Sequence, residues 1–163
     1  MKKYSKEDQK ILAAWSVNCA AHVLPFFEKI YPDDDRPRKA IEVCRAWVKT
    51  GVFKMTDIRE ASLSAHAAAR MAVNNKAACF AARAAGQAVA TAHVSQHAYG
   101  GAYYALKAVA ALDPLKAEAR INKELIWQSR RLPDNLRHEI IGRIIIEKRV
   151  KGMFIGIDKG NDF

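Results

Sequence analysis

The 163-residue chain lacks the features of several specialised protein classes. It contains 8 glycines and 5 prolines, too few for a collagen-like or low-complexity chain. Its three cysteines, Cys19, Cys44 and Cys79, are odd in number and lie far apart without a C-x-x-C pair, so no disulfide or zinc framework is recognisable. We therefore expect the three cysteines to be reduced and buried, with packing as their only role.

Long apolar segments are missing as well. No uninterrupted run of about 18 apolar residues occurs, and the N-terminal residues lead into no short apolar segment with a cleavage site. The sequence therefore predicts a cytoplasmic protein that has no membrane contact. Half of the residues are hydrophobic and 27% are charged, which is typical of a globular protein, and the length is that of one domain.

Acidic residues are absent from residues 61–112, where the charged residues are Arg70, Lys76, Arg83 and Lys107. The stems of Lys and Arg can lie along apolar surface, so we expect this segment to be the most buried part of the chain. The whole chain carries a formal net charge of +10, which makes nucleic acid an alternative partner. The basic clusters are short, mixed with acids and without a recognition helix or stacking motif, so specific nucleic-acid binding is not expected.

Alanine is the most informative abundant residue. The 29 alanines, together with recurring caps and helical spacing, predict an all-α fold: a single-domain helical bundle of about seven helices over residues 1–163. Ser5 is expected to cap the first helix, and Pro25 to kink or end it. We expect the helices to begin near Lys6, Arg36, Thr56, Lys76, Tyr103, Pro114 and Leu136.

Two boundaries depend on residues with conflicting preferences. The pair Gly100-Gly101 is expected to interrupt the helix that begins near Lys76. The seventh helix is expected to continue through Ile144 and Ile145, which keep helical spacing. Residues 148–163 contain strand-like residues without an obvious partner strand, so they are predicted to be a docked or frayed tail.

Three histidines form a possible polar site: His66, His93 and His97. His93 and His97 are four positions apart, so on one helix both rings could project from the same face as zinc ligands. The intervening residues lack the glutamate of a metalloprotease, and the surrounding sequence offers no carboxylate ligand. We therefore predict no bound metal and no other cofactor. Hydrogen bonding in a helix-packing seam is the simpler role, and a histidine-dependent metal enzyme stays as an alternative.

Catalytic motifs of other kinds are not recognisable. The sequence shows no nucleophile elbow, no cysteine-protease signature and no glycine-rich phosphate loop, so we expect a protein that is not an enzyme and has no catalytic residues.

A different feature is the charged turn, Asp33 to Arg38, which does not match a calcium loop. Helix capping explains at least one of its carboxylates. The candidate partner-binding residues in this turn are Asp33, Asp34, Arg36 and Arg38.

Several segments resemble a family of small helical immunity proteins of bacterial polymorphic toxin systems. The similar segments are WSVNCAAHVLPFFE (15–28), YPDDDRPRKAIEVCRAWVKTG (31–51), HAAAR (66–70), AARAAGQAVATAHVSQHAYGGAYYALKA (81–108) and ELIWQSRRLPDNLR (124–137). The resemblance leaves out the N-terminal residues and the tail after Glu147. It implies an all-helical, non-enzymatic protein that protects its producer by binding a cognate toxin. Immunity proteins against basic nucleases are often acidic, so the positive charge of this chain argues against a nuclease as the toxin.

Overall fold

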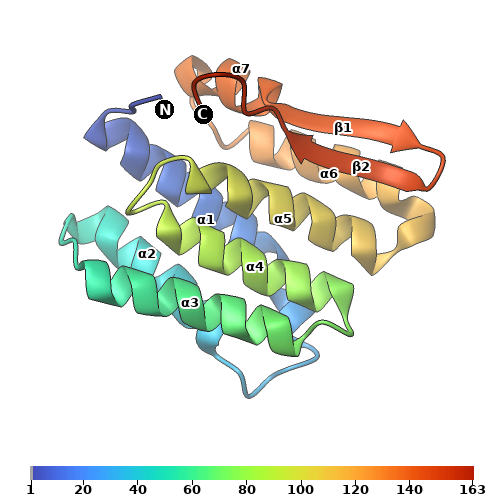
Figure 1. The fold of residues 1–163 in the computed structure, drawn as a ribbon, viewed down its shortest axis with the longest axis horizontal. Helices are drawn as coiled ribbons and strands as arrows, with labels where there is room; N and C mark the ends of the chain where they lie inside the picture. Colours follow the sequence, from blue (N-terminus) through green and yellow to red (C-terminus); the bar gives the residue numbers. More distant parts are fainter. Residues whose placement is uncertain (1) are drawn as a thin grey trace.

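The computed structural model describes residues 2–163, which form seven α-helices, one 3-10 helix and a small antiparallel sheet (Figure 1). The predicted all-α class is confirmed, with the sheet as an addition at the C-terminal end. The elements in chain order are α1 (Lys6–Glu28), α2 (Arg36–Thr50), α3 (Met55–Met71), α4 (Lys76–Ala90), α5 (His97–Leu112), η1 (Pro114–Lys116), α6 (Ala117–Ser129), α7 (Asp134–Gly142), β1 (Ile144–Arg149) and β2 (Gly152–Ile157).

Helix α1 begins where its sequence predicts. The Ser5 hydroxyl oxygen accepts a hydrogen bond from the backbone N–H of Asp8 at 3.0 Å, which satisfies one free donor of the first turn. Pro25 lies inside the helix, which continues to Glu28. By length and composition α1 could cross a membrane, yet its large apolar side chains are buried within the protein. The burial of Leu12, Trp15, Val23 and Phe27 makes α1 a core helix.

Helix α4 occupies the centre of the bundle and packs against α1, α2, α3 and α5. In Figure 1, α3, α4 and α5 run side by side. Most of the buried residues of α4 are alanines, and their small side chains let the neighbouring backbones approach closely. The expected burial of the acid-free segment is confirmed for α4 and α5, whereas Leu63 and Met71 of α3 are exposed.

Gly100 and Gly101 do not interrupt a helix, so that prediction was wrong. Helix α5 runs through both glycines, and α4 ends earlier, at Ala90. A Cβ atom on Gly101 would lie 2.0 Å from the Oγ of Ser16 in α1, and one on Gly100 would lie 2.6 Å from the Oε1 of Gln87 in α4. The two glycines are therefore the points where α5 approaches α1 and α4 most closely, and packing outweighs their low helix propensity.

The C-terminal segment also differs from its prediction. Helix α7 ends at Gly142, and the isoleucines expected to extend it form β1, which pairs antiparallel with β2 in the register Ile144↔Ile157 to Arg149↔Gly152. Isoleucine is β-branched and favours strands, and a partner strand lies two residues beyond the end of β1. One face of this hairpin packs on the bundle, with Ile155 only 8% exposed. Residues 148–163 thus supply the end of β1, all of β2 and a short tail.

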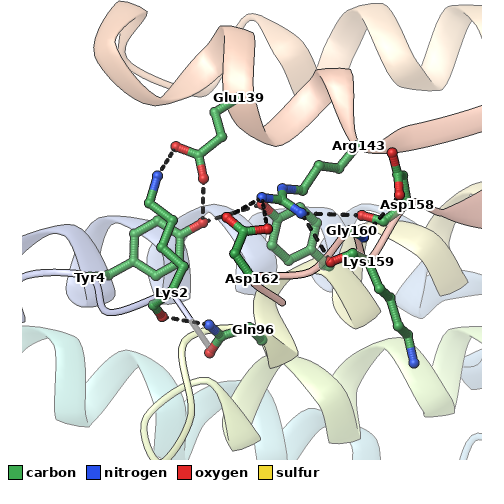
Figure 2. A network of polar contacts seen from close by, with 10 residues as sticks. Lys2, Tyr4, Gln96, Glu139, Arg143, Asp158, Lys159, Gly160 and Asp162 are labelled. Carbon is green, nitrogen blue, oxygen red and sulfur yellow. Dashed lines mark hydrogen bonds and ion pairs between the residues drawn. The ribbon is translucent and has the colours of Figure 1, made fainter.

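A network of polar contacts ties the tail and the N-terminal segment to the end of α7 and to each other, the last through the Lys2 N–H, which donates to the Asp162 carbonyl (Figure 2). The Lys2 ammonium pairs with Glu139 of α7, and the Tyr4 hydroxyl donates to the same carboxylate at 2.9 Å. The Arg143 guanidinium donates to both carboxylate oxygens of Asp162, at 2.7 and 2.8 Å. These contacts place both ends of the described chain together beside α5 and fix the position of the tail (Figure 1).

Candidate functional site

A groove of about 510 Å³ lies between the hairpin and the bundle, and we call it the α5–β2 groove. Residues 154–157 of β2 form one wall, and Lys159 and Phe163 of the tail also line it. The opposite wall belongs to α4 and to the first half of α5, where Gly100 leaves room for the side chain of Gln87. Its principal side chains on this wall are Gln87, His97, Tyr103 and Tyr104.

Three positively charged groups lie in or beside this groove, and we call them the groove cations. Lys159 lines the groove, whereas Arg83 and Lys107 lie against the rings of Tyr104 and Tyr103, which line it. The Lys107 ammonium lies 4.6 Å from the centroid of the Phe80 ring and donates to the Tyr103 hydroxyl at 3.3 Å. The Arg83 guanidinium lies 5.8 Å from the ring centroid of Tyr104, and the Lys159 ammonium lies 5.6 Å from that of Phe163. Such cation–π contacts orient a charge without neutralising it.

The three groove cations, Arg83, Lys107 and Lys159, share a second property. In the part of the chain that the structure describes, none of them forms an ion pair with a carboxylate. For the two cations of α4 and α5 the sequence supplies the reason, because residues 61–112 contain no Asp or Glu that could pair with them. The groove and its border therefore carry positive charge that no carboxylate of the described chain pairs, beside aromatic surface.

The predicted polar site is brought together only in part. His97 contacts Gln87 through a hydrogen bond of 2.8 Å between Nδ1 and Oε1, and burial, followed by the charge of His93, lowers the pKa of His97. His66 packs against α4 at Gly86, where an added Cβ would meet its Nε2 at 2.8 Å. Burial also lowers the pKa of His66, with a smaller contribution from Arg83. Both rings are therefore held in a helix-packing seam.

The geometry expected for a metal-binding histidine pair is wrong. Helix α4 ends at Ala90, so His93 lies exposed in the connection to α5, while His97 begins the next helix. The two side chains therefore do not share the face of one helix. Among residues 2–163, no group of three His, Cys, Asp or Glu side chains is arranged to hold a metal ion.

The charged turn is largely neutralised by its own contacts. The Arg36 guanidinium donates to both carboxylate oxygens of Asp34, at 2.8 and 2.6 Å, and this contact lowers the pKa of Asp34. Arg38 forms a similar pair of hydrogen bonds with Glu28, at 2.6 and 2.7 Å. Of the four predicted partner-binding residues, Asp33 alone has no ion-pair partner within residues 2–163.

A second polar cluster joins α1 to α6, and sequence reasoning missed it. The Nδ1 of His22 lies 2.8 Å from a carboxylate oxygen of Glu124, which is only 3% exposed. The His22 ring stacks on Trp127 with 3.9 Å between centroids, and Arg131 covers the same indole at 3.5 Å. His22 and Glu124 are about a hundred positions apart along the chain and belong to no local motif, so only the fold could reveal their contact.

Cys19 lies one helical turn before His22, and with Glu124 it makes a set of residue types that resembles a nucleophile, a base and an acid. Cys19 is fully buried, however, and burial raises the pKa of its thiol well above the usual value. A protonated, inaccessible thiol is a poor nucleophile. Cys44 and Cys79 are also free and buried, so the expectation that the three cysteines are unbridged and buried is confirmed. We interpret the cluster as a structural contact between α1 and α6.

Comparison with known proteins identifies the group to which this bundle belongs. A family model matches residues 2–135, which include α1 to α6 and end as α7 begins, so the hairpin and the tail lie outside the match. Neither the curated proteins nor the solved structures contain a match to the chain. The family match covers most of the sequence and confirms the resemblance carried by its helical segments. The chain belongs to the family described as Imm-5 like putative immunity protein.

Proposed function

We propose that this protein neutralises a cognate bacterial toxin by direct, non-covalent binding, in the cytoplasm of the cell that produces it. Its membership of an immunity-protein family supports this proposal. The observation that carries it is the α5–β2 groove, where Lys159 lines the groove and Arg83 and Lys107 stand beside its aromatic rings, all without carboxylate partners in the described chain. Tyrosine and arginine are among the residue types that most often dominate the energy of protein interfaces.

The groove has the chemistry of binding. Among its described lining residues there is no Asp, Glu or Cys, and the side chain that titrates nearest to neutral pH is His97, which is hydrogen-bonded to Gln87. No nucleophile and base stand together there. Unpaired cations instead attract an acidic partner over a distance and orient it as it arrives. The toxin surface that binds here is therefore expected to be acidic.

Neutralisation is tested by co-expressing the protein with the toxin encoded by the adjacent gene and scoring growth and co-purification. Lys107→Glu reverses one groove charge and is expected to abolish most of the protection. The matched control is Lys123→Glu, which makes the same change of charge at an exposed site on α6. Wild-type protein that neither restores growth nor co-purifies with the toxin would overturn the proposed function. Equal protection by the two variants would move the interface away from the groove.

A basic helical module that associates with nucleic acid is the second candidate, because aromatic rings beside cations also suit unpaired bases. It predicts that the purified protein binds a single-stranded oligonucleotide of about 20 thymidines, that binding falls steeply as salt is raised, and that Lys107→Glu removes it. Binding to the toxin with no measurable oligonucleotide binding decides for the immunity function.

A further inference from the structure

The edge of β2, rather than one of its faces, lines the α5–β2 groove. Four consecutive residues, 154–157, line the groove. Successive side chains of a strand point to opposite faces, so four in a row can border one groove only where the edge of the strand faces it. The described sheet has two strands, and β1 occupies the other edge of β2. The edge toward the groove is therefore unpaired.

The backbone register shows which groups this edge presents. Opposed residues in an antiparallel pair alternate between those that exchange backbone hydrogen bonds and those whose N–H and C=O groups point outward. The N–H of Asp158 donates to the C=O of Arg143 at 2.8 Å, which continues the hairpin beyond Ile144↔Ile157. By alternation, the N–H groups of Met153, Ile155 and Ile157 point away from β1. Within residues 2–163 no backbone or side-chain group of another element bonds them.

The two edges of the hairpin differ in composition. Half of β1 is charged, with Glu147-Lys148-Arg149 at its end, and charged residues discourage the pairing of an exposed edge with another chain. β2 contains no charged residue and no proline from Gly152 to Ile157. The edge that faces the groove is thus the one that lacks protection against strand addition.

We propose that an extended acidic segment of the toxin binds in the groove by adding to the free edge of β2 as a third strand. This inference rests on the proposed function and specifies how the complex forms. The six residues of β2 span roughly 20 Å, so the segment would be about five or six residues long. Its backbone pairs with β2, and its carboxylates reach Lys159 at the tail and Lys107 and Arg83 beside the lining rings of Tyr103 and Tyr104. Charge complementarity is what selects an acidic occupant.

The location of the edge bears on partner choice. The hairpin lies outside the family match over residues 2–135, whereas Tyr103, Tyr104 and the cations of the helical wall lie inside it. One wall of the groove therefore belongs to the shared family region and the other belongs to the C-terminal addition. Backbone pairing to β2 gives affinity, and the pockets beside the edge select the side chains of the bound segment.

Proline substitution tests the backbone contact directly. Ile157→Pro removes an N–H that points into the groove and takes no part in pairing with β1, while Ile157→Ala removes a similar part of the side chain and keeps the N–H. Lys148→Pro is the matched control, because it places proline on the opposite, outward edge of the same hairpin. Affinity for a catalytically inactivated form of the toxin encoded by the adjacent gene is measured by calorimetry for each variant.

We expect Ile157→Pro to bind at least about tenfold more weakly than Ile157→Ala, and Lys148→Pro to bind within about twofold of wild type. Hydrogen exchange of the wild-type complex provides a readout that needs no variant: the amides of Ile155 and Ile157 become protected on binding. Toxin binding without this protection, or equal affinity of the two Ile157 variants, overturns strand addition and leaves the proposed function standing. Failure of the wild-type protein to bind the toxin overturns both.

Discussion

The charged turn and the α5–β2 groove are both rich in charge, and they differ in what that charge can do. In the turn, Arg36 is paired with Asp34 and Arg38 with Glu28. Beside the groove, Arg83 and Lys107 lie on aromatic rings and have no acidic residue within the segment 61–112 that contains them. A paired cation has little left to offer a partner, whereas an unpaired one keeps its field.

The number of charged residues in a segment therefore does not show how many of them remain unpaired and able to attract a partner. The segment DDDRPR is easily recognised in the sequence because its charged residues are adjacent. Because they are adjacent, residues of opposite charge can also pair with one another. The groove cations are widely spaced along the chain: the packing of α4 against α5 brings Arg83 and Lys107 beside the aromatic rings of the groove, and the tail places Lys159 in its lining. Variants of the two regions therefore provide a direct test of which surface binds.

The largest expected effect comes from reversing both helical cations of the groove. Arg83→Glu with Lys107→Glu should weaken toxin binding by about 100-fold, because each change removes an attraction and adds a repulsion at the same surface. When binding is measured at low salt by stopped-flow kinetics, most of the lost affinity should come from slower association. Circular dichroism should stay close to wild type and the melting temperature should fall only slightly, since the two cations make cation–π contacts and one long hydrogen bond but no ion pair in the described chain. A binding loss below about threefold would remove the groove from the interface.

The charged turn should respond less. Asp33→Lys with Asp34→Lys keeps Asp35 and is expected to weaken the complex by roughly three- to tenfold, through altered steering by exposed charge. It also breaks the contact of Asp34 with Arg36, which should lower the free energy of unfolding by up to about 1 kcal/mol. Growth rescue and urea unfolding measure the two effects separately. A folded double variant that loses all protection would show that the toxin binds the charged turn rather than the groove.

Much of the fold could be predicted because its signals are local. Ser5 caps α1, α4 begins at Lys76 as expected, and the alanine-rich segment forms the buried centre of the bundle. These features depend on residues within a few positions of each other, where helix propensity and capping act. The burial of the three cysteines also follows from their small apolar character.

The predictions failed where contacts between distant segments decide. Gly101 remains helical because α5 needs its missing side chain beside Ser16, and the isoleucines after Gly142 become a strand because β2 returns to pair with them. The groove could not be predicted, since its walls come from α4, α5, β2 and the tail. The one sequence signal that points to the groove is the acid-free segment 61–112. It predicts burial, and it also leaves Arg83 and Lys107 without a nearby carboxylate.

The smallest expected effect is on the pH dependence of stability, and it comes from His97, which lines the groove. Burial holds the pKa of His97 below its ordinary value, so between about pH 6.5 and that lower pKa the unfolded chain binds a proton that the folded protein does not. The free energy of unfolding therefore falls as the pH falls through this window. His97→Gln keeps a donor for Gln87 and removes the titration, so it should lose less stability than wild type between about pH 7.5 and 5.

Urea unfolding at the two pH values measures this difference. His66 and Glu124 also titrate: burial lowers the pKa of His66 and raises that of Glu124, so their contributions have opposite signs. Both groups are present in wild type and variant, so their effects cancel in the comparison except for the smallest contribution to the lowered pKa of His66, which comes from the charge of His97 itself. Protonation of His97 also adds a positive charge to the groove, so an acidic toxin segment should bind wild type more tightly at the lower pH than it binds His97→Gln. An equal pH dependence of stability in the two proteins would show that folding does not lower the pKa of His97.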